Sequence, residues 1–155
     1  MLKKLIHVVL SPVGRITRGQ FWLAWILILI LGWNLQQARQ DTGSLVLGLA
    51  YLYLTITIYG KRLHDLGRST WNLLWPYAIH AGLIGITVML ANQALRNMDY
   101  NTMQFLGVLA VVPFIIWIGF ALLIGLPQGM NGDNVFGADP RQQATIAPAP
   151  GQAAQ

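Results

Sequence analysis

The sequence predicts an all-α membrane protein with four transmembrane helices, and two observations lead to this class. The first is composition: only 10% of the 155 residues are charged, and 55% are apolar, whereas soluble domains carry about 25% charged residues. The second is pattern, because the apolar residues gather in four long segments separated by short polar stretches. So few charges cannot cover the surface of a chain of this length in water. The composition therefore argues strongly against a water-soluble monomer.

The four apolar segments have the length that a membrane-spanning helix needs. The hydrocarbon core is about 30 Å thick and a helix rises about 1.5 Å per residue, so a span takes about 20 residues. A helix of a soluble protein would show a polar face, and the first two segments show none. Four strands would be too few for a closed barrel, and lipid forbids an open sheet edge. We expect the spans at about residues 19–38, 42–60, 71–91 and 105–126.

The segments around the spans are expected to be short and polar or disordered. Residues 1–18 form a cytoplasmic N-terminal segment whose apolar run is too short for a cleavable signal. This segment is expected on the membrane surface or packed beneath the bundle. Residues 127–141 contain Asn-Gly and Asp-Pro pairs, which are typical of turns. Residues 142–155 are rich in Ala, Pro and Gln and predict a disordered tail. Pro113 lies inside the fourth span and should kink it.

The cations are distributed unequally between the two sides of the predicted bundle. With four spans, the N-terminus, the second loop and the C-terminus share one side, which collects eight of the ten Lys and Arg residues. The other side has Arg39 and Arg96. Loops rich in Lys and Arg stay in the cytoplasm, so both termini are predicted to be cytoplasmic. The high isoelectric point reports this topology and does not indicate nucleic-acid binding, because the cations bracket membrane spans.

Three polar clusters share the predicted cytoplasmic face, and each has a recognisable pattern. The first follows a GRxxRxxFW-like pattern and contains Gly14, Arg15, Arg18, Phe21 and Trp22. The second follows an RRLHDxGRSGWW-like pattern and contains Arg62, Leu63, His64, Asp65, Gly67, Arg68, Ser69 and Trp71. The third follows a GxNxFGxxP-like pattern and contains Gly132, Asn134, Phe136, Gly137 and Pro140.

With these motifs the chain resembles the DUF805 family of small bacterial inner-membrane proteins, a family named for lacking a known function. It departs from the family pattern at Lys61, Thr70 and Asn72, where Arg, Gly and Trp are usual. The similarity covers about residues 14–140. It implies a four-helix integral protein of the cytoplasmic membrane and supplies no reaction, so function must be argued from the residues.

The three clusters allow a structural interpretation. Asp65 would pair with Arg62 or Arg68, and Gly67 would permit the bend that follows the helix. Ion pairs of this kind near a membrane surface fix geometry more than they add stability. The structural turn candidates are His64, Asp65, Gly67, Asn134, Phe136 and Gly137.

The same clusters also allow a functional interpretation as an anion site. Arginine forks suit bidentate contacts to phosphate, and basic pockets on the cytoplasmic side bind anionic lipid headgroups. The candidate headgroup residues are Arg15, Arg18, Arg62 and Arg68. The expected partners are therefore membrane lipids, with a second copy of the chain or another membrane protein as further options.

Enzymatic function is not indicated by the sequence. The chain has no cysteine and no HExxH, GxSxG or P-loop spacing, so no catalytic residue, metal ligand or cofactor is assigned. His64 and Asp65 are adjacent, and neighbours on a helix point in different directions. The alternative function is an oligomeric transporter or channel subunit. It ranks second because His80 is the only ionisable residue within the predicted spans.

Overall fold

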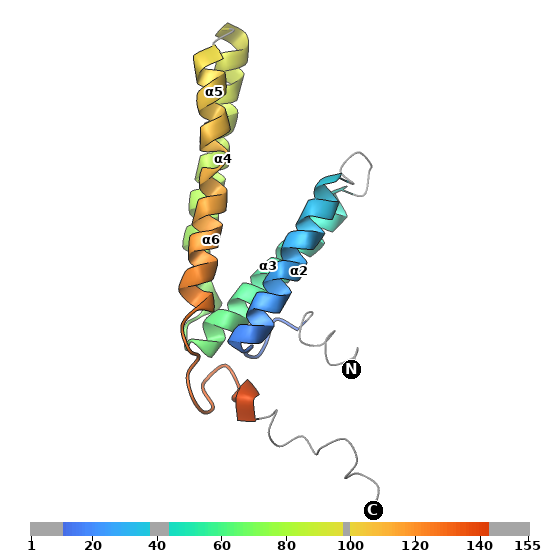
Figure 1. Ribbon diagram of the computed structural model, residues 1–155, viewed down its shortest axis with the longest axis vertical. Helices are drawn as coiled ribbons and strands as arrows, with labels where there is room; N and C mark the ends of the chain where they lie inside the picture. The colour runs from blue at the N-terminus through green and yellow to red at the C-terminus, as the bar shows by residue number, and fades with distance from the viewer. Residues whose placement is uncertain (1–10, 38–43, 98–99, 143–155) are drawn as a thin grey trace, which may run out of the picture. The chain divides into compact units, whose positions relative to one another are not determined.

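The computed structural model describes residues 11–37, 44–97 and 100–142, and the regular structure in these ranges is helical (Figure 1). The elements are α2 (Arg18–Gln37), α3 (Ser44–Asp65), the 3₁₀ helix η1 (Thr70–Leu73), α4 (Leu74–Asn97), α5 (Tyr100–Leu109) and α6 (Val112–Gly125). The all-α prediction is confirmed for this part of the chain. The chain divides into two compact units, residues 1–70 with 124–155 and residues 71–123. The predicted surface segment at 1–10 and the predicted tail at 143–155 lie outside the described residues.

The first unit is built on an antiparallel hairpin of α2 and α3 (Figure 1). Phe21 is fully buried in it and meets the rings of Trp22 and Tyr59 edge-on. One turn further along α2, the indole N–H of Trp25 donates a hydrogen bond of 2.8 Å to the Tyr59 hydroxyl. These aromatic contacts join the first turns of α2 to the last turns of α3. They thereby fix the position of the chain that enters α2.

The start of α2 is set by a capping box at Thr17 and Gln20. The Thr17 hydroxyl accepts a hydrogen bond from the Gln20 backbone N–H at 3.3 Å, and the Gln20 side chain accepts one from the Thr17 N–H at 2.9 Å. Reciprocal bonds of this kind satisfy N–H groups that have no partner within the helix. The helix therefore begins at Arg18, one residue before the predicted span.

The end of α3 is a Schellman motif centred on Gly67. Its N–H donates to the His64 carbonyl at 3.0 Å, and the next N–H, of Arg68, donates to the Leu63 carbonyl at 2.8 Å. This pair of bonds requires a left-handed residue, and Gly67 has a φ of 70°. The helix extends five residues beyond the predicted span, so His64 and Asp65 are helical. Because the helix stops at Asp65, Arg68 and Trp71 do not continue it.

The second unit contains η1, α4, α5 and most of α6. Pro76 is buried in the first turn of α4, where its missing N–H has no helical partner to lose. The helical segment that was expected from residue 105 begins at Tyr100 and is interrupted at residues 110–111, just before Pro113. The ring of a proline clashes with the carbonyl four residues earlier, and its nitrogen has no hydrogen to donate to that carbonyl. The disturbance predicted for this helix at Pro113 is therefore seen as the break between α5 and α6.

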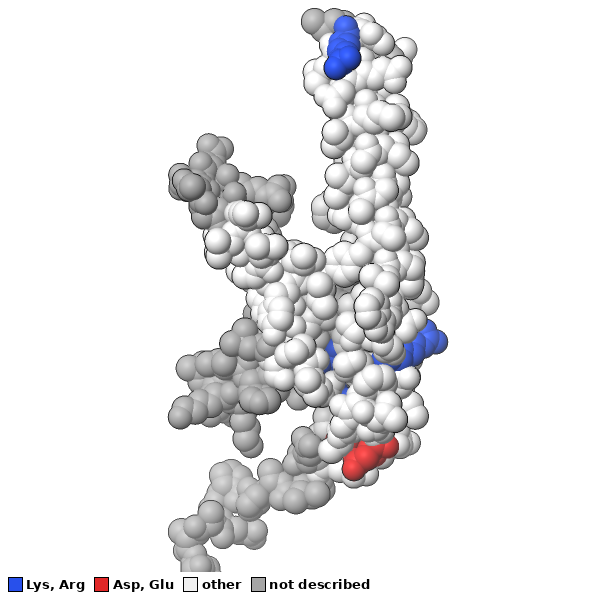
Figure 2. All heavy atoms as spheres, turned by 180° about the vertical axis from the view of Figure 1, so that it is seen from behind, with Lys and Arg blue, Asp and Glu red and all other residues white. Residues whose placement is uncertain are grey.

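Two described helical segments are long and apolar enough to cross a membrane, Thr70–Asn97 with 28 residues and Tyr100–Gly125 with 26. On the face seen in Figure 2, these helices show no Lys, Arg, Asp or Glu over most of their length. Large apolar side chains are exposed along both, among them Val88, Phe114 and Ile115. Exposed apolar surface of this extent is typical of a membrane protein. Of the four predicted spans, the third and fourth correspond to these segments.

Candidate functional site: a buried arginine network beside a basic pocket

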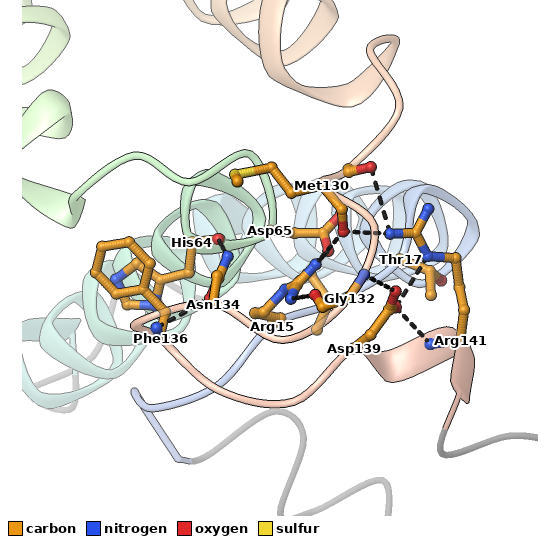
Figure 3. Close-up of polar contacts among 12 residues, drawn as sticks. Arg15, Thr17, His64, Asp65, Met130, Gly132, Asn134, Phe136, Asp139 and Arg141 are labelled. Carbon is orange, nitrogen blue, oxygen red and sulfur yellow. Dashed lines mark hydrogen bonds and ion pairs between the residues drawn. The ribbon is translucent and has the colours of Figure 1, made fainter. Parts of the chain in front are cut away.

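The centre of the candidate site is the carboxylate of Asp65, the last residue of α3 (Figure 3). Asp65 is 2% exposed. Its Oδ1 accepts hydrogen bonds from Nε and Nη2 of Arg15, at 3.2 and 3.0 Å. Its Oδ2 accepts one from Nη1 of Arg62, one helical turn earlier. A single buried carboxylate therefore pairs with two buried guanidinium groups.

The remaining donors of Arg62 are directed to backbone carbonyl groups. Its Nε donates to Ile124 at 2.9 Å, and its Nη2 donates to Pro127. A longer bond of 3.4 Å runs from Nη1 to Ile16. Ile124 and Pro127 belong to the end of α6 and the segment after it, where the last carbonyls of a helix have no helical partner. Arg62 thus ties the chain that leaves α6 to the end of α3.

Arg15 makes the same kind of contact with the turn segment that follows. Its Nη1 donates to the Gly132 carbonyl at 2.6 Å and, at 3.4 Å, to the Gly137 carbonyl. Its Nη2 donates to the Met130 carbonyl at 2.5 Å. Met130 is also held through its own N–H, which donates to the Asp65 carbonyl at 2.8 Å. The chain before α2, the end of α3 and residues 129–137 therefore share one network.

His64 anchors the same turn segment from the other side of Asp65. Its ring stacks on Phe136, with the centroids 4.2 Å apart and the planes 2° from parallel. Its backbone carbonyl accepts a hydrogen bond of 2.9 Å from the side-chain amide of Asn134, whose oxygen in turn accepts from the Phe136 N–H. Asn134 and Gly137 form the isolated bridge that closes the turn.

The hydrogen bonds of the His64 ring identify its tautomer. Nδ1 lies 3.2 Å from the Gly14 carbonyl, and Nε2 lies 2.8 Å from the Thr70 hydroxyl. A carbonyl can only accept, so Nδ1 carries the proton and Nε2 accepts from Thr70. Burial is the largest effect on His64 and lowers its pKa. The hydrogen bond to Gly14 raises the pKa and the charge of Lys61 lowers it, so the net shift is downward. His64 is therefore neutral at pH 7.

The second acidic side chain of the site, Asp139, organises the end of the turn segment. Its Oδ2 accepts from the Gly132 N–H at 2.9 Å, and its Oδ1 accepts from the N–H and the Nε of Arg141, at 3.0 and 2.9 Å. The hydrogen bonds from Arg141, first from its side chain and then from its backbone, lower the pKa of Asp139 to about 2. Arg141 also donates to the carbonyls of Gly129 and Met130.

A pocket of about 340 Å³ opens beside this network. The backbone and side chains that line it come from the start of α2, the end of α3 and the segment after α6. The lining residues are Thr17, Arg18, Gly19, Arg62, Asp65, Gln128, Gly129 and Arg141. Three guanidinium groups face one carboxylate here, so the lining has a net charge of plus two.

The electrostatics of the pocket show that its other cations act on Arg62. Burial lowers the pKa of Arg62; Asp65 raises it, and the charges of Arg18 and Arg141 lower it further. A cation is disfavoured in this way when like charges lie near it in a poorly solvated place. Lys61, buried one residue before Arg62, also has its pKa lowered by burial. An anion in the pocket would relieve this repulsion.

The structure separates the four arginines that the sequence grouped as headgroup contacts. Arg15 and Arg62 have side chains with no exposed surface, and their donors are directed to Asp65 and to carbonyls. Arg62 lines the pocket with a fully buried side chain, and Arg15 lies within the network and does not line the pocket. Arg18 is exposed at the pocket and donates to the Leu126 carbonyl at 3.3 Å. Arg68 is exposed and does not line the pocket.

The predicted turn residues are brought together, and of the two alternative partners predicted for Asp65 the structure has Arg62. Asp65 also pairs with Arg15, which the sequence did not indicate, and not with Arg68. The reason is the left-handed Gly67, which turns the chain before Arg68 can follow Asp65 on a common helix.

Sequence reasoning missed three contributors to the site. Thr17 could have been found, because Thr17 and Gln20 have the spacing of a capping box. Arg141 was counted as a cation of the tail, and no local pattern predicts its contacts with Asp139 and with two carbonyl groups. Gly129 was also missed: a Cβ at this position would collide with the Asp65 carboxylate, so only glycine fits there.

No group of three or more His, Cys, Asp or Glu side chains is placed to hold a metal ion within residues 11–37, 44–97 and 100–142. No curated protein and no solved structure matches the chain. A family model described as a protein of unknown function, DUF805, matches residues 9–138. This match covers most of the 155 residues and includes the network and nearly all of its loops. The chain belongs to the DUF805 family.

Proposed function

We propose that this protein is a four-span, non-enzymatic component of the bacterial cytoplasmic membrane that holds an anionic lipid headgroup at its cytoplasmic face. In this proposal α2 and α3 span the membrane together with the two long apolar segments, and both termini lie in the cytoplasm. The unequal distribution of Lys and Arg between the predicted loops supports this orientation. The exposed leucines and isoleucines along α2 and α3 support the additional two spans.

The observation that carries the proposed function is the basic pocket at the end of the α2–α3 hairpin. Three arginines border it, and its one carboxylate is already paired with Arg15 and Arg62. Arg18 and Gly19, the first two residues of α2, also line it. Helix N-termini favour anions, because unpaired N–H groups and the helix dipole point toward them. The lining is therefore suited to a phosphate group.

The surroundings of the pocket support a ligand that belongs to the membrane. Leu126 is 61% exposed, and its carbonyl accepts the hydrogen bond from Arg18. Leu23, just over one turn into α2, is 58% exposed. A lipid could place its phosphate in the pocket while its acyl chains contact these apolar side chains. A basic site next to membrane spans is the usual arrangement for anionic headgroups.

Lipid retention tests this function. The full chain is extracted in mild detergent, offered equal amounts of phosphatidylcholine and phosphatidylglycerol, and examined by native mass spectrometry. We expect preferential retention of phosphatidylglycerol, weakened by about tenfold in Arg18→Gln because a charge-assisted hydrogen bond is lost.

Arg68→Gln is the matched control for this experiment. It removes the same charge from an exposed arginine that does not line the pocket, so retention should stay close to that of the unaltered protein. Equal retention of the two lipids, or equal losses in both variants, would overturn the proposed site.

The alternative of a transporter or channel subunit has one residue in its favour. His80, on α4, accepts a hydrogen bond at Nδ1 from the indole of Trp117 at 3.3 Å. Within the described part of residues 71–123, Arg96 at the end of α4 is the only charged residue. Ion and proton pathways depend on ionisable groups inside the membrane, so a lipid-binding function is better supported.

A further inference from the structure

The pocket has features that discriminate among anionic headgroups, and this inference rests on the proposed function. Its lining has a net charge of plus two, from Arg18, Arg62 and Arg141 against Asp65. The ion-pair partners of these residues are Arg15 and Asp139, and counting them leaves the net charge unchanged. A ligand with two negative charges would neutralise the site, whereas a singly charged ligand would leave one buried cation unbalanced.

The buried position of one of these cations makes the imbalance costly. Arg62 has no exposed side-chain surface, and its pKa is lowered by burial. Its Asp65 partner is shared with Arg15, so one carboxylate balances two guanidinium groups. Burying a charge without compensation is unfavourable, and a nearby opposite charge offsets the cost. Arg62 lines the pocket, so an anion bound there would supply that opposite charge.

The uncharged part of the lining also fits a group with several exposed oxygens. Thr17 offers a hydroxyl, Gln128 a side-chain amide, and Gly19 a backbone N–H. A Cβ at Gly19 would meet no heavy atom within 4 Å, so open space lies beside this backbone. A phosphate monoester presents three terminal oxygens and carries about −1.5 to −2 charges at pH 7. A phosphodiester presents two such oxygens and one charge.

We propose that the pocket selects a phosphate monoester over a phosphodiester, and that the physiological ligand is a lipid whose headgroup is a bare phosphate. In this proposal the exposed side chain of Arg18 contacts the phosphate directly. Arg62 acts from the buried side as a fixed positive charge, because most of its donors are directed to Asp65 and to carbonyl groups. Arg141, with a side chain 39% exposed, also lines the pocket.

Binding to lipid nanodiscs tests this selectivity. The full chain is reconstituted into nanodiscs of phosphatidylcholine containing either phosphatidic acid or phosphatidylglycerol, the lipid that stays bound on release is measured by native mass spectrometry, and glycerol 3-phosphate serves as the soluble monoester. We expect phosphatidic acid to be retained about tenfold more strongly than phosphatidylglycerol, the effect of one further charge-assisted hydrogen bond. Arg18→Gln should remove this preference, Arg18→Lys should keep part of it, and Arg68→Gln should leave it intact.

The outcomes separate this inference from the function on which it rests. Equal retention of the two anionic lipids, both above phosphatidylcholine, would overturn the monoester selectivity and leave the proposed function standing. Retention of neither lipid above phosphatidylcholine would overturn both. Displacement of phosphatidic acid by an equal concentration of glycerol 3-phosphate would show that the acyl chains add nothing, and it would overturn the assignment of a lipid ligand.

Discussion

At the scale of single residues, the site depends on one carboxylate. Asp65 is buried and pairs with Arg15 and Arg62, which in turn satisfy carbonyl groups of the chain after α6. Replacing a buried ion pair as a whole is often tolerated, but removing one partner leaves an uncompensated charge. The ion pairs with Asp65 hold Arg15 and Arg62 in the orientation in which they donate hydrogen bonds to these carbonyl groups.

Asp65→Asn should therefore destabilise the protein strongly. Two buried guanidinium groups would lose their counter-charge, at a cost of about 3–5 kcal/mol. Thermal unfolding of the detergent-solubilised protein measures the effect. Asp133→Asn is the control: Asp133 is exposed and its Oδ1 accepts from the Asp139 N–H, a bond that an Asn oxygen can also accept. Similar losses in the two variants would contradict the role of Asp65.

His64 should make stability depend on pH. Its pKa in the folded protein is lowered from 6.5, by burial first, so below about pH 6.5 the unfolded chain binds more protons than the folded one. Stability is fully present above that pH and decreases as the pH falls toward the folded pKa of His64. Unfolding curves between about pH 5 and 8 measure this slope.

The His64→Gln variant identifies the group responsible for the slope. An amide does not titrate in this range, so the slope should become smaller, while His80→Gln should retain it. A slope that is unchanged in His64→Gln would assign the pH dependence to another group.

At the scale of elements, the junction after α3 decides how the three clusters meet. Gly67 ends the helix in a left-handed conformation and lies against the thioether of Met130. The capping box of Thr17 and Gln20 fixes where α2 begins, as Gly67 fixes where α3 ends. Both junctions bring loops to the end of the hairpin, where Asp65 is available as the common acceptor.

Gly67→Ala tests the first of these junctions. The left-handed conformation costs a residue with a Cβ about 1–2 kcal/mol, and the new methyl group would overlap the Met130 sulfur. We expect a loss of stability of at least this size in thermal unfolding, reduced but not abolished when Met130→Ala is added. Gly82→Ala, inside α4 with open space around its Cβ position, should be neutral or slightly stabilising. A neutral Gly67→Ala variant would argue against the Schellman motif.

At the scale of the whole molecule, the composition and the exposed apolar helices indicate a membrane protein, and the orientation is open to a direct test. The chain has no cysteine, so single cysteines report on accessibility without background. Val135, in the turn segment, is 92% exposed. Val135→Cys in intact cells should react with a membrane-impermeant maleimide only after permeabilisation.

Gln40→Cys, in the first predicted loop, is the partner variant and should react without permeabilisation. The expected pattern follows from the eight cations on one side of the predicted bundle and the two on the other. Labelling of Val135→Cys from outside would reverse the proposed topology, and labelling of both from outside would contradict four spans.

The helical class and the positions of the helices were predictable from the sequence by itself. Hydropathy, segment length and the absence of polar faces are local properties, and α2 and α4 begin within a few residues of their predicted positions. The Gly67 bend and the turn chemistry of Asn134 were predictable for the same reason. The break before Pro113 follows from a single residue.

The partners of the charged residues were decided by the tertiary structure. Arg15 and Asp65 are 50 positions apart, and Arg15 and the Gly132 carbonyl are 117 apart, so no local spacing indicates that they meet. Backbone carbonyls carry no signature in the sequence, yet they accept most of the hydrogen bonds of the two buried arginines. The sequence by itself predicted that most of the cations gather on one side of the bundle. The fold decided which of them are buried as structural charges and which border the pocket, because burial and hydrogen bonding depend on segments that only the folded chain brings together.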